Sequence, residues 1–73
     1  MNIIKARELR GRLQIAHALL AATVTGANLY VENHPSLTPG QRKKFEENLA
    51  QQLTLAMAEI ETAQRLLVQP QGG

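Results

Sequence analysis

Asn33-His34-Pro35-Ser36-Leu37-Thr38-Pro39-Gly40 is the stretch of this 73-residue chain that decides its fold. It is the only dense cluster of turn-forming residues in the interior of the sequence. On each side of it, apolar side chains recur in steps of three and four, as they do along one face of a helix. The sequence therefore predicts an all-α, antiparallel two-helix hairpin in a single domain, residues 1–73. Its expected parts are a helix at about 3–32, a loop at 33–38, a helix at about 39–68 and a flexible tail at 69–73.

The start of the second helix carries the clearest local signal. Thr38 is a favourable N-cap residue, Pro39 suits the first helical position, and Gln41 completes a Thr-x-x-Gln capping box. The helix should end before Pro70, because a residue that precedes proline is disfavoured in the α conformation.

The amino-acid composition favours helices, and it also favours association of the chain into oligomers. Apolar residues make up 44% of the chain, mostly Ala and Leu, with one Phe, one Tyr and no Trp, which is typical of helices rather than strands. Chains shorter than about 80 residues usually need disulfides, a metal or oligomerisation to stabilise a small core. The chain has no cysteine, and its two histidines are far apart in sequence. Oligomerisation is therefore the expected source of stability.

The first helix carries two apolar stripes rather than one. The stripe expected to pack against the second helix comprises Ala6, Leu9, Leu13, Ala16, Leu20, Val24, Ala27 and Val31, and the second stripe comprises Ile15, Leu19, Ala22, Gly26 and Leu29. The matching stripe of the second helix comprises Phe45, Leu49, Leu53, Ala56, Ile60, Ala63 and Leu67, flanked by Met57 and Leu66. Two stripes make an apolar face too wide for one neighbouring helix.

A two-fold dimer that forms a four-helix bundle would bury the remaining apolar surface. Ala18, Ala22 and Gly26 form a ladder of small residues that would allow close approach of two helix backbones. The candidate dimer-interface residues are Leu13, Ile15, Leu19, Leu20, Ala22, Gly26, Leu53, Met57 and Ile60.

No arrangement of side chains in the sequence indicates catalysis or metal binding. Ser36 is the only serine, the chain has no aspartate, and the adjacent Glu46 and Glu47 point in different directions on a helix. His17 and His34 lack further ligands at the spacing of a zinc site. We therefore expect a protein that is not an enzyme and that has no cofactor and no metal.

Basic residues crowd the expected start of each helix. Lys5, Arg7, Arg10 and Arg12 do so in the first helix, and Arg42, Lys43 and Lys44 do so in the second. Cations there oppose the helix dipole, so the clusters either bind an anionic or acidic partner or cover the helix ends and aid solubility. Tyr30, the only tyrosine, either contacts a partner or packs against Phe45 or Leu37 to close the hairpin. The candidate partner-binding residues are Arg7, Arg10, Arg12, Tyr30, Arg42, Lys43 and Lys44.

The N-terminal segment has the order of residues found in signal peptides. The cluster of basic residues precedes residues 13–31, which carry no charge. Polar residues within this stretch, among them Gln14, His17 and Asn28, weaken both a signal-peptide and a transmembrane interpretation. We expect a cytoplasmic protein without membrane insertion, with secretion or a periplasmic location as the alternative.

Two resemblances bear on function. Leu37-Thr38-Pro39-Gly40-Gln41 resembles the LTxxQ motif of periplasmic Spy/CpxP-type chaperones; the match covers five residues, and the same letters form a general helix start. The expected architecture is similar to that of Rop-type RNA-binding hairpin dimers, in helix layout rather than in any sequence motif. Neither resemblance assigns a family or transfers a functional residue.

Three functions follow from these observations. The leading hypothesis is a small non-enzymatic helical protein that self-associates and binds another protein to modulate it, as an adaptor, inhibitor or co-chaperone. The first alternative is a nucleic-acid-binding dimer that uses the basic helix starts, and the second is a periplasmic chaperone-like protein. A net charge of only +2 makes nucleic acid a weaker expectation than a protein partner.

Overall fold

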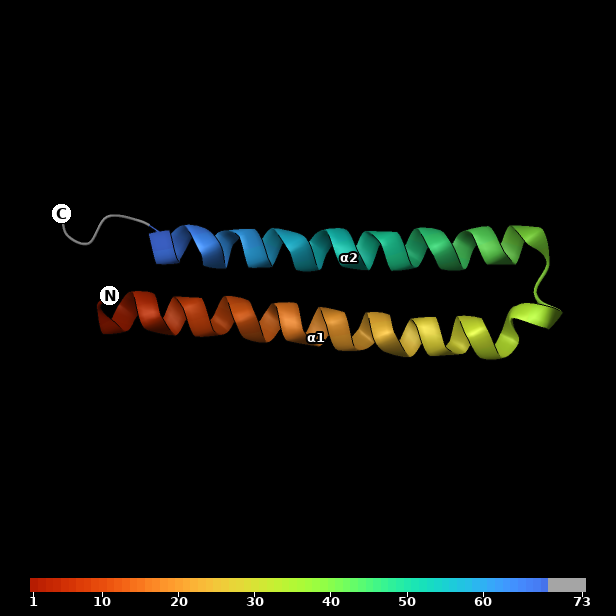
Figure 1. Ribbon diagram of the computed structural model, residues 1–73, viewed down its shortest axis with the longest axis horizontal. Helices are drawn as coiled ribbons and strands as arrows, with labels where there is room; N and C mark the ends of the chain where they lie inside the picture. Colours follow the sequence, from red (N-terminus) through yellow and green to blue (C-terminus); the bar gives the residue numbers. More distant parts are fainter. Residues whose placement is uncertain (69–73) are drawn as a thin grey trace.

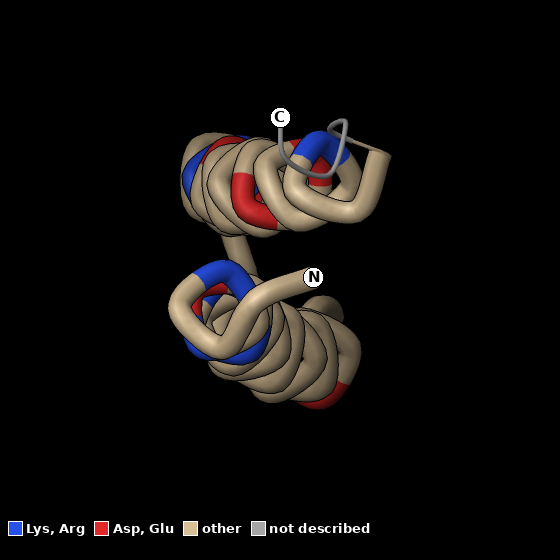
Figure 2. Tube along the Cα trace, turned by 90° about the vertical axis from the view of Figure 1, so that its left-hand side faces the viewer, with Lys and Arg blue, Asp and Glu red and all other residues tan. Residues whose placement is uncertain are grey.

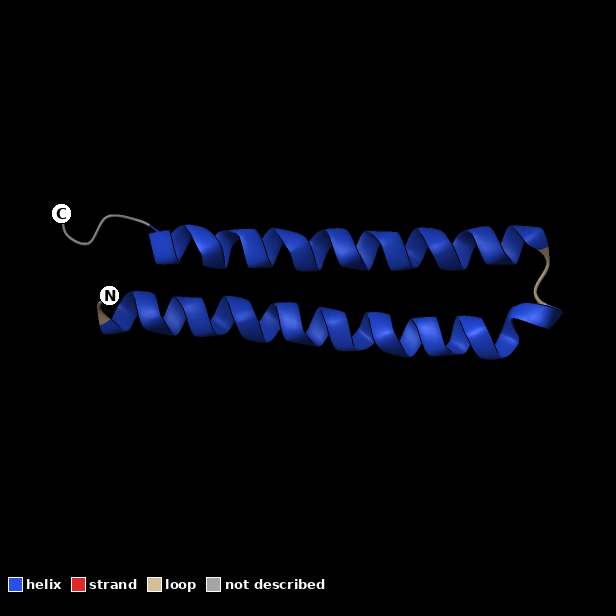
Figure 3. Ribbon diagram, in the orientation of Figure 1, coloured by secondary structure: helices blue, strands red, loops and turns tan. Residues whose placement is uncertain are grey.

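Two long antiparallel helices lie side by side and form a hairpin, as Figures 1 and 3 show. The computed structural model describes residues 1–68, so the tail predicted at 69–73 lies outside the described residues. Helix α1 spans Ile3–Asn33, the short 3₁₀ helix η1 spans His34–Ser36, and α2 spans Pro39–Val68. The predicted two-helix hairpin is confirmed, and no strand occurs among the described residues. One difference is local: the expected loop begins with a turn of 3₁₀ helix.

Side-chain caps explain why each helix starts where it does. At α2, the Thr38 hydroxyl accepts a hydrogen bond from the Gln41 amide at 3.2 Å, and the Gln41 side chain accepts one from the Thr38 amide at 2.9 Å. The predicted capping box is thus confirmed. At α1, the Asn2 side chain accepts a hydrogen bond from the Lys5 amide at 2.9 Å. Sequence reasoning missed this cap, although asparagine is a preferred N-cap residue.

The contact between α1 and α2 follows a regular heptad spacing. Ala16 and Thr23 are buried on α1, and Ala56, Ala63 and Leu66 are buried on α2. Residues in the same phase are half-buried, and they extend the contact along both helices: Leu9, Arg12, Leu19, Gly26 and Tyr30 on α1, and Arg42, Phe45, Leu49, Gln52 and Glu59 on α2. We call this contact the seam. Steps of three and four keep it facing the neighbouring helix, as in a coiled coil.

The predicted inner stripe of α1 is wrong for several of its larger residues. Val24 and Val31 are 60% and 76% exposed, and Leu13 and Leu20 are 48% and 39% exposed. The seam is rotated from them toward smaller and more polar residues. Apolar content alone did not reveal this rotation, because the seam lies between the two predicted stripes and includes the polar residues Arg12 and Thr23.

Close helix packing at Gly26 fixes the rotation of α1. A Cβ atom at this position would lie 3.1 Å from Cδ2 of Leu49, which is closer than an ordinary carbon–carbon contact. The glycine therefore lets α2 approach the backbone of α1, as the small-residue ladder suggested. The close contact lies within the hairpin, whereas Gly26 was expected to serve a dimer interface.

Candidate protein-interaction surface

One side of the hairpin carries a row of large apolar side chains from both helices, most of them exposed, with Arg10 and His17 of α1 and Lys43, Glu46 and Gln64 of α2 in the same phases. Its members lie four residues, or eight residues, after seam positions: Leu13, Leu20 and Val24 on α1, and Leu53, Met57, Ile60 and Leu67 on α2. In two antiparallel right-handed helices, positions with the same offset from the seam fall on the same side of the pair. We call this set the apolar face.

The members of the apolar face are far from covered within the hairpin. Leu53, Met57 and Leu67 are 42%, 58% and 59% exposed, and Ile60 is half-buried. Leu20 and Leu53 lie at nearly the same height, as do Leu13 and Ile60, because the hairpin brings residue 12 next to residue 59 and residue 26 next to residue 49. The result is a ladder of large aliphatic pairs along one side of the molecule.

The opposite side of the hairpin is less uniformly apolar. Ile15 and Leu29 from α1 and Leu55 from α2 are 46%, 47% and 50% exposed. On α2 the positions in phase with Leu55 are polar, namely Gln41, Asn48 and Thr62. Apolar side chains on this side therefore come mostly from α1.

The structure divides the nine candidate dimer-interface residues among three places. Leu13, Leu20, Leu53, Met57 and Ile60 lie on the apolar face. Ile15 and Ala22 lie on the opposite side, and Leu19 and Gly26 belong to the seam. Val24 and Leu67 were not among the candidates, since the sequence pattern assigned them to the contact within the hairpin alone. The heptad phase of Ala16, Thr23, Ala56 and Ala63 is the signal that separates these groups.

An ion pair crosses the seam near the open end of the hairpin. Nη1 of Arg12 lies 3.1 Å from Oε2 of Glu59, and both side chains are partly exposed. Arg12 was a candidate partner-binding residue, and the structure instead pairs it with the neighbouring helix. Together with the contact of Gly26 and Leu49, the pair fixes the register of the two helices.

An aromatic cluster closes the other end. The Tyr30 ring stacks on Phe45 at a centroid distance of 5.5 Å and contacts His34 at 5.3 Å, and its hydroxyl donates a 2.7 Å hydrogen bond to Glu46. This hydrogen bond is the main reason that the pKa of Tyr30 is raised above 10.0. Of the two roles left open for Tyr30, packing against Phe45 is the one observed.

The two basic clusters lie at opposite ends of the hairpin. At the loop end, Nη2 of Arg42 donates a 3.2 Å hydrogen bond to the carbonyl oxygen of His34, while Lys43 and Lys44 are exposed. At the open end, which faces the viewer in Figure 2, α2 adds Arg65 to the cations of α1. Arg65 was not a sequence candidate, because it lies more than fifty residues from Arg7 and Arg10. Only the antiparallel fold brings them to the same end.

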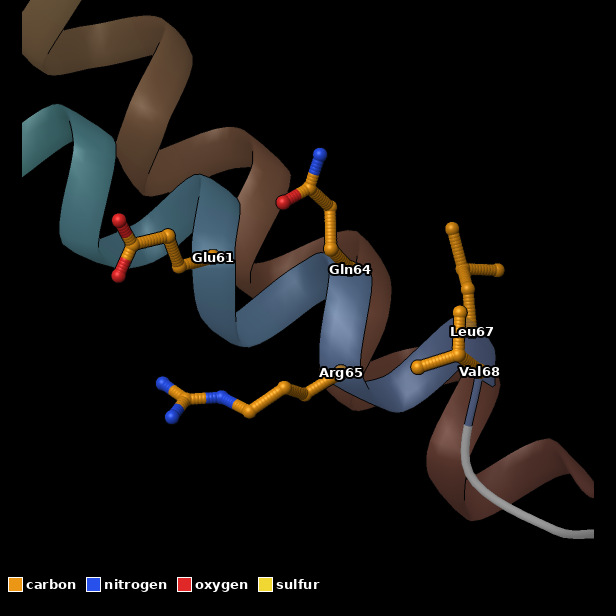
Figure 4. Close-up of a pocket in the computed structure, with 5 residues that line it drawn as sticks. All are labelled: Glu61, Gln64, Arg65, Leu67 and Val68. Carbon is orange, nitrogen blue, oxygen red and sulfur yellow. The ribbon is translucent and has the colours of Figure 1, made fainter.

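The rest of the surface formed by residues 1–68 includes open hollows. Figure 4 shows a wide hollow on the last turns of α2, with Glu61 and Arg65 projecting to one side and Leu67 and Val68 at the end of the described helix. Within residues 1–68, no group of three potential metal ligands comes together. Neither helix in this range combines the length and the apolar character needed to cross a membrane.

Comparison with known proteins assigns no family. No protein-family model, no curated protein and no solved structure matches this chain.

Proposed function

We propose that this chain is a non-enzymatic helical interaction protein that associates with itself through the apolar face, forms a four-helix bundle, and as a dimer binds and modulates another protein. The observation that carries the proposal is the row of large aliphatic side chains left exposed along one side of the hairpin. A contiguous apolar surface of this kind is typical of interaction sites.

The exposed area of the chain supports the proposed dimer. The chain exposes 5518 Å². A compact monomer of 8.0 kDa exposes about 4,500 Å², so the excess is on the order of 1,000 Å². If residues 69–73 contribute their largest possible share, roughly 700 Å² for an extended segment, the other residues still exceed expectation by about 600 Å². Two chains would then bury roughly 1,200–2,000 Å² together, the usual range of a stable protein interface.

The opposite side of the hairpin supports the second half of the proposal. Ile15, Leu29 and Leu55 would remain in contact with water in a dimer that uses the apolar face. They form a smaller apolar surface with polar neighbours, the composition of a non-obligate protein interface. We therefore propose this side as the surface for a different protein.

Sedimentation equilibrium tests the self-association directly. Leu20→Glu and Leu53→Glu each place a carboxylate on the apolar face and should convert the dimer to a monomer. Leu55→Glu is the matched control, because Leu55 lies two residues from Leu53, is similarly exposed and points to the opposite side. A monomeric wild-type chain with a cooperative unfolding transition would refute the self-association.

The partner side is tested with variants that leave the dimer intact. The dimer should capture a protein from its cell of origin, and Ile15→Glu combined with Leu29→Glu should abolish the capture. The captured protein could instead be retained by the Ile15→Glu, Leu29→Glu variant and lost with Leu20→Glu or Leu53→Glu. That result would place its binding site at the junction between the two copies of the dimer.

The second candidate function is nucleic-acid binding at the basic ends. The specific observation in its favour is that Arg65 of α2 lies at the same end of the hairpin as Arg7 and Arg10 of α1. Binding of this type should weaken steeply as salt rises from about 50 mM. It should be lost when Arg7, Arg10, Lys43 and Lys44 are replaced by glutamate. The absence of any shift of RNA or DNA at low salt would dispose of this candidate.

A further inference from the structure

The central part of the apolar face is arranged symmetrically about one level of the hairpin, whereas its outer members Val24 and Leu67 have the charged residues Arg10 and Glu46 as counterparts across that level. On α1, Leu13 and Leu20 lie four residues before and three residues after His17. On α2, Leu53 and Ile60 have the same spacing about Met57. The register set by the Arg12–Glu59 pair places His17 within one turn of Met57, so both helices share the same midpoint.

The symmetry extends to the ends of α1. Ile3 and Val31, both strongly exposed, each lie fourteen residues from His17. A two-fold axis that passes between two hairpins at this level, perpendicular to the helices, would lay each apolar face on the other along its whole length. Leu13 of one copy would then meet Leu20 of the other, and Leu53 would meet Ile60.

The charges also distinguish the two possible orientations of a second copy. The open half of the hairpin, residues 1–19 and 54–68, carries five cations and three carboxylates, whereas the loop half carries three of each. A dimer with both loops at the same end would bring two basic open ends together. A dimer with the loops at opposite ends separates them by about the 45 Å length of a helix, several times the Debye length of about 8 Å at physiological salt.

We propose that the apolar face is occupied by a second copy of this chain with its loop at the opposite end, so that α1 packs on α1 of the second copy and α2 packs on α2. The inference rests on the proposed self-association and specifies its geometry. The area estimated above matches one such partner, and the arrangement keeps the basic open ends apart. The four central aliphatic side chains, Leu13, Leu20, Leu53 and Ile60, are spaced symmetrically about a common level.

Single-cysteine cross-linking tests this geometry, because the chain has no native cysteine. Met57→Cys and His17→Cys place a thiol at an exposed position next to the proposed axis. Each variant should form a cross-linked dimer with itself under mild oxidation or with a short bismaleimide. Ala18→Cys and Gln51→Cys, exposed on surfaces away from the apolar face, are the matched controls and should remain uncross-linked. Circular dichroism confirms that each variant is folded.

The other outcomes separate the geometry from the proposed function. Cross-linking only in a mixture of Met57→Cys and His17→Cys would mean that α1 packs on α2 of the second copy, with both loops at one end, which overturns the inference but retains the dimer. A wild-type dimer whose variants do not cross-link at either position would overturn it as well. A monomeric wild type in sedimentation would refute the proposed self-association itself.

Discussion

Replacing Gly26 and Gly11 by alanine measures how closely the two helices approach. Both glycines lie inside α1, where alanine is more favourable than glycine by about 1 kcal/mol. A Cβ at Gly11 would have no heavy atom within 4 Å, so Gly11→Ala should gain this full amount. A Cβ at Gly26 would lie 3.1 Å from Leu49 Cδ2, and the leucine tip must move several tenths of an ångström. A displaced rotamer costs on the order of 0.5–1.5 kcal/mol, which offsets the gain.

The expected result is a clear difference between the two variants. Gly11→Ala should raise the melting temperature by about 4–8 °C, the shift that 1 kcal/mol produces in a domain of this size. Gly26→Ala should change it little, and Gly26→Leu should destabilise the hairpin strongly. Thermal unfolding followed by circular dichroism at one fixed protein concentration provides the measurement. Equal stabilisation by the two alanine variants would refute the close approach of α2 at Gly26.

Three further predictions concern single contacts of the hairpin. Thr38→Ala removes the cap of α2 and should lower the free energy of unfolding by about 1 kcal/mol in urea titrations, whereas a neutral result would contradict the capping box. A double-mutant cycle on Arg12 and Glu59 should give a coupling of about 0.2–1 kcal/mol that shrinks as salt rises, because the pair is partly exposed; a salt-independent coupling would contradict this. Tyr30, the only tyrosine, should titrate above pH 10.0 by absorbance, and Glu46→Ala should lower that midpoint. Since the pKa of Tyr30 is raised in the folded chain, its contribution to stability is present below pH 10.0 and is lost as pH rises through the folded value.

The parts of the fold that depend on local sequence were predictable, and the parts that depend on helix rotation were not. The turn cluster at 33–40 and the Thr38–Gln41 capping box act within a few residues. The cluster connects the two helices as expected, with an added 3₁₀ turn at His34–Ser36, and the capping box has the expected hydrogen bonds. The set of α1 residues that enters the seam depends on contacts across the hairpin, such as Gly26 with Leu49. A hydrophobic pattern favours the larger side chains for the inner stripe, whereas the geometry of the pair favours small ones.

The candidate site residues show the same contrast between features set by local sequence and features set by contacts between the helices. Five of the nine candidate dimer-interface residues lie on the apolar face. They could be predicted because the sequence pattern already indicates more apolar surface than one neighbouring helix can cover. Two other features depend on residues about fifty positions apart in the sequence: the Arg12–Glu59 ion pair and the position of Arg65 at the open end. Such contacts leave no local signal in the sequence and become visible only once the helices are aligned.

The seam and the apolar face differ in how much large aliphatic surface they contain. This difference predicts that folding of the hairpin and formation of the dimer are coupled. The seam buries three alanines and one leucine as its apolar core, while the four leucines of the apolar face are 39–59% exposed. Dimer formation should therefore bury more large aliphatic surface than hairpin closure does, and the isolated hairpin should be only marginally stable. Unfolding should then depend on concentration, because dissociation accompanies it. A tenfold increase in concentration corresponds to about 1.4 kcal/mol, and two 73-residue chains have an unfolding entropy of about 0.3 kcal/mol/K, so the melting temperature should rise by about 4–5 °C. A melting temperature that stays constant over a hundredfold range of concentration would show that the seam alone stabilises the fold.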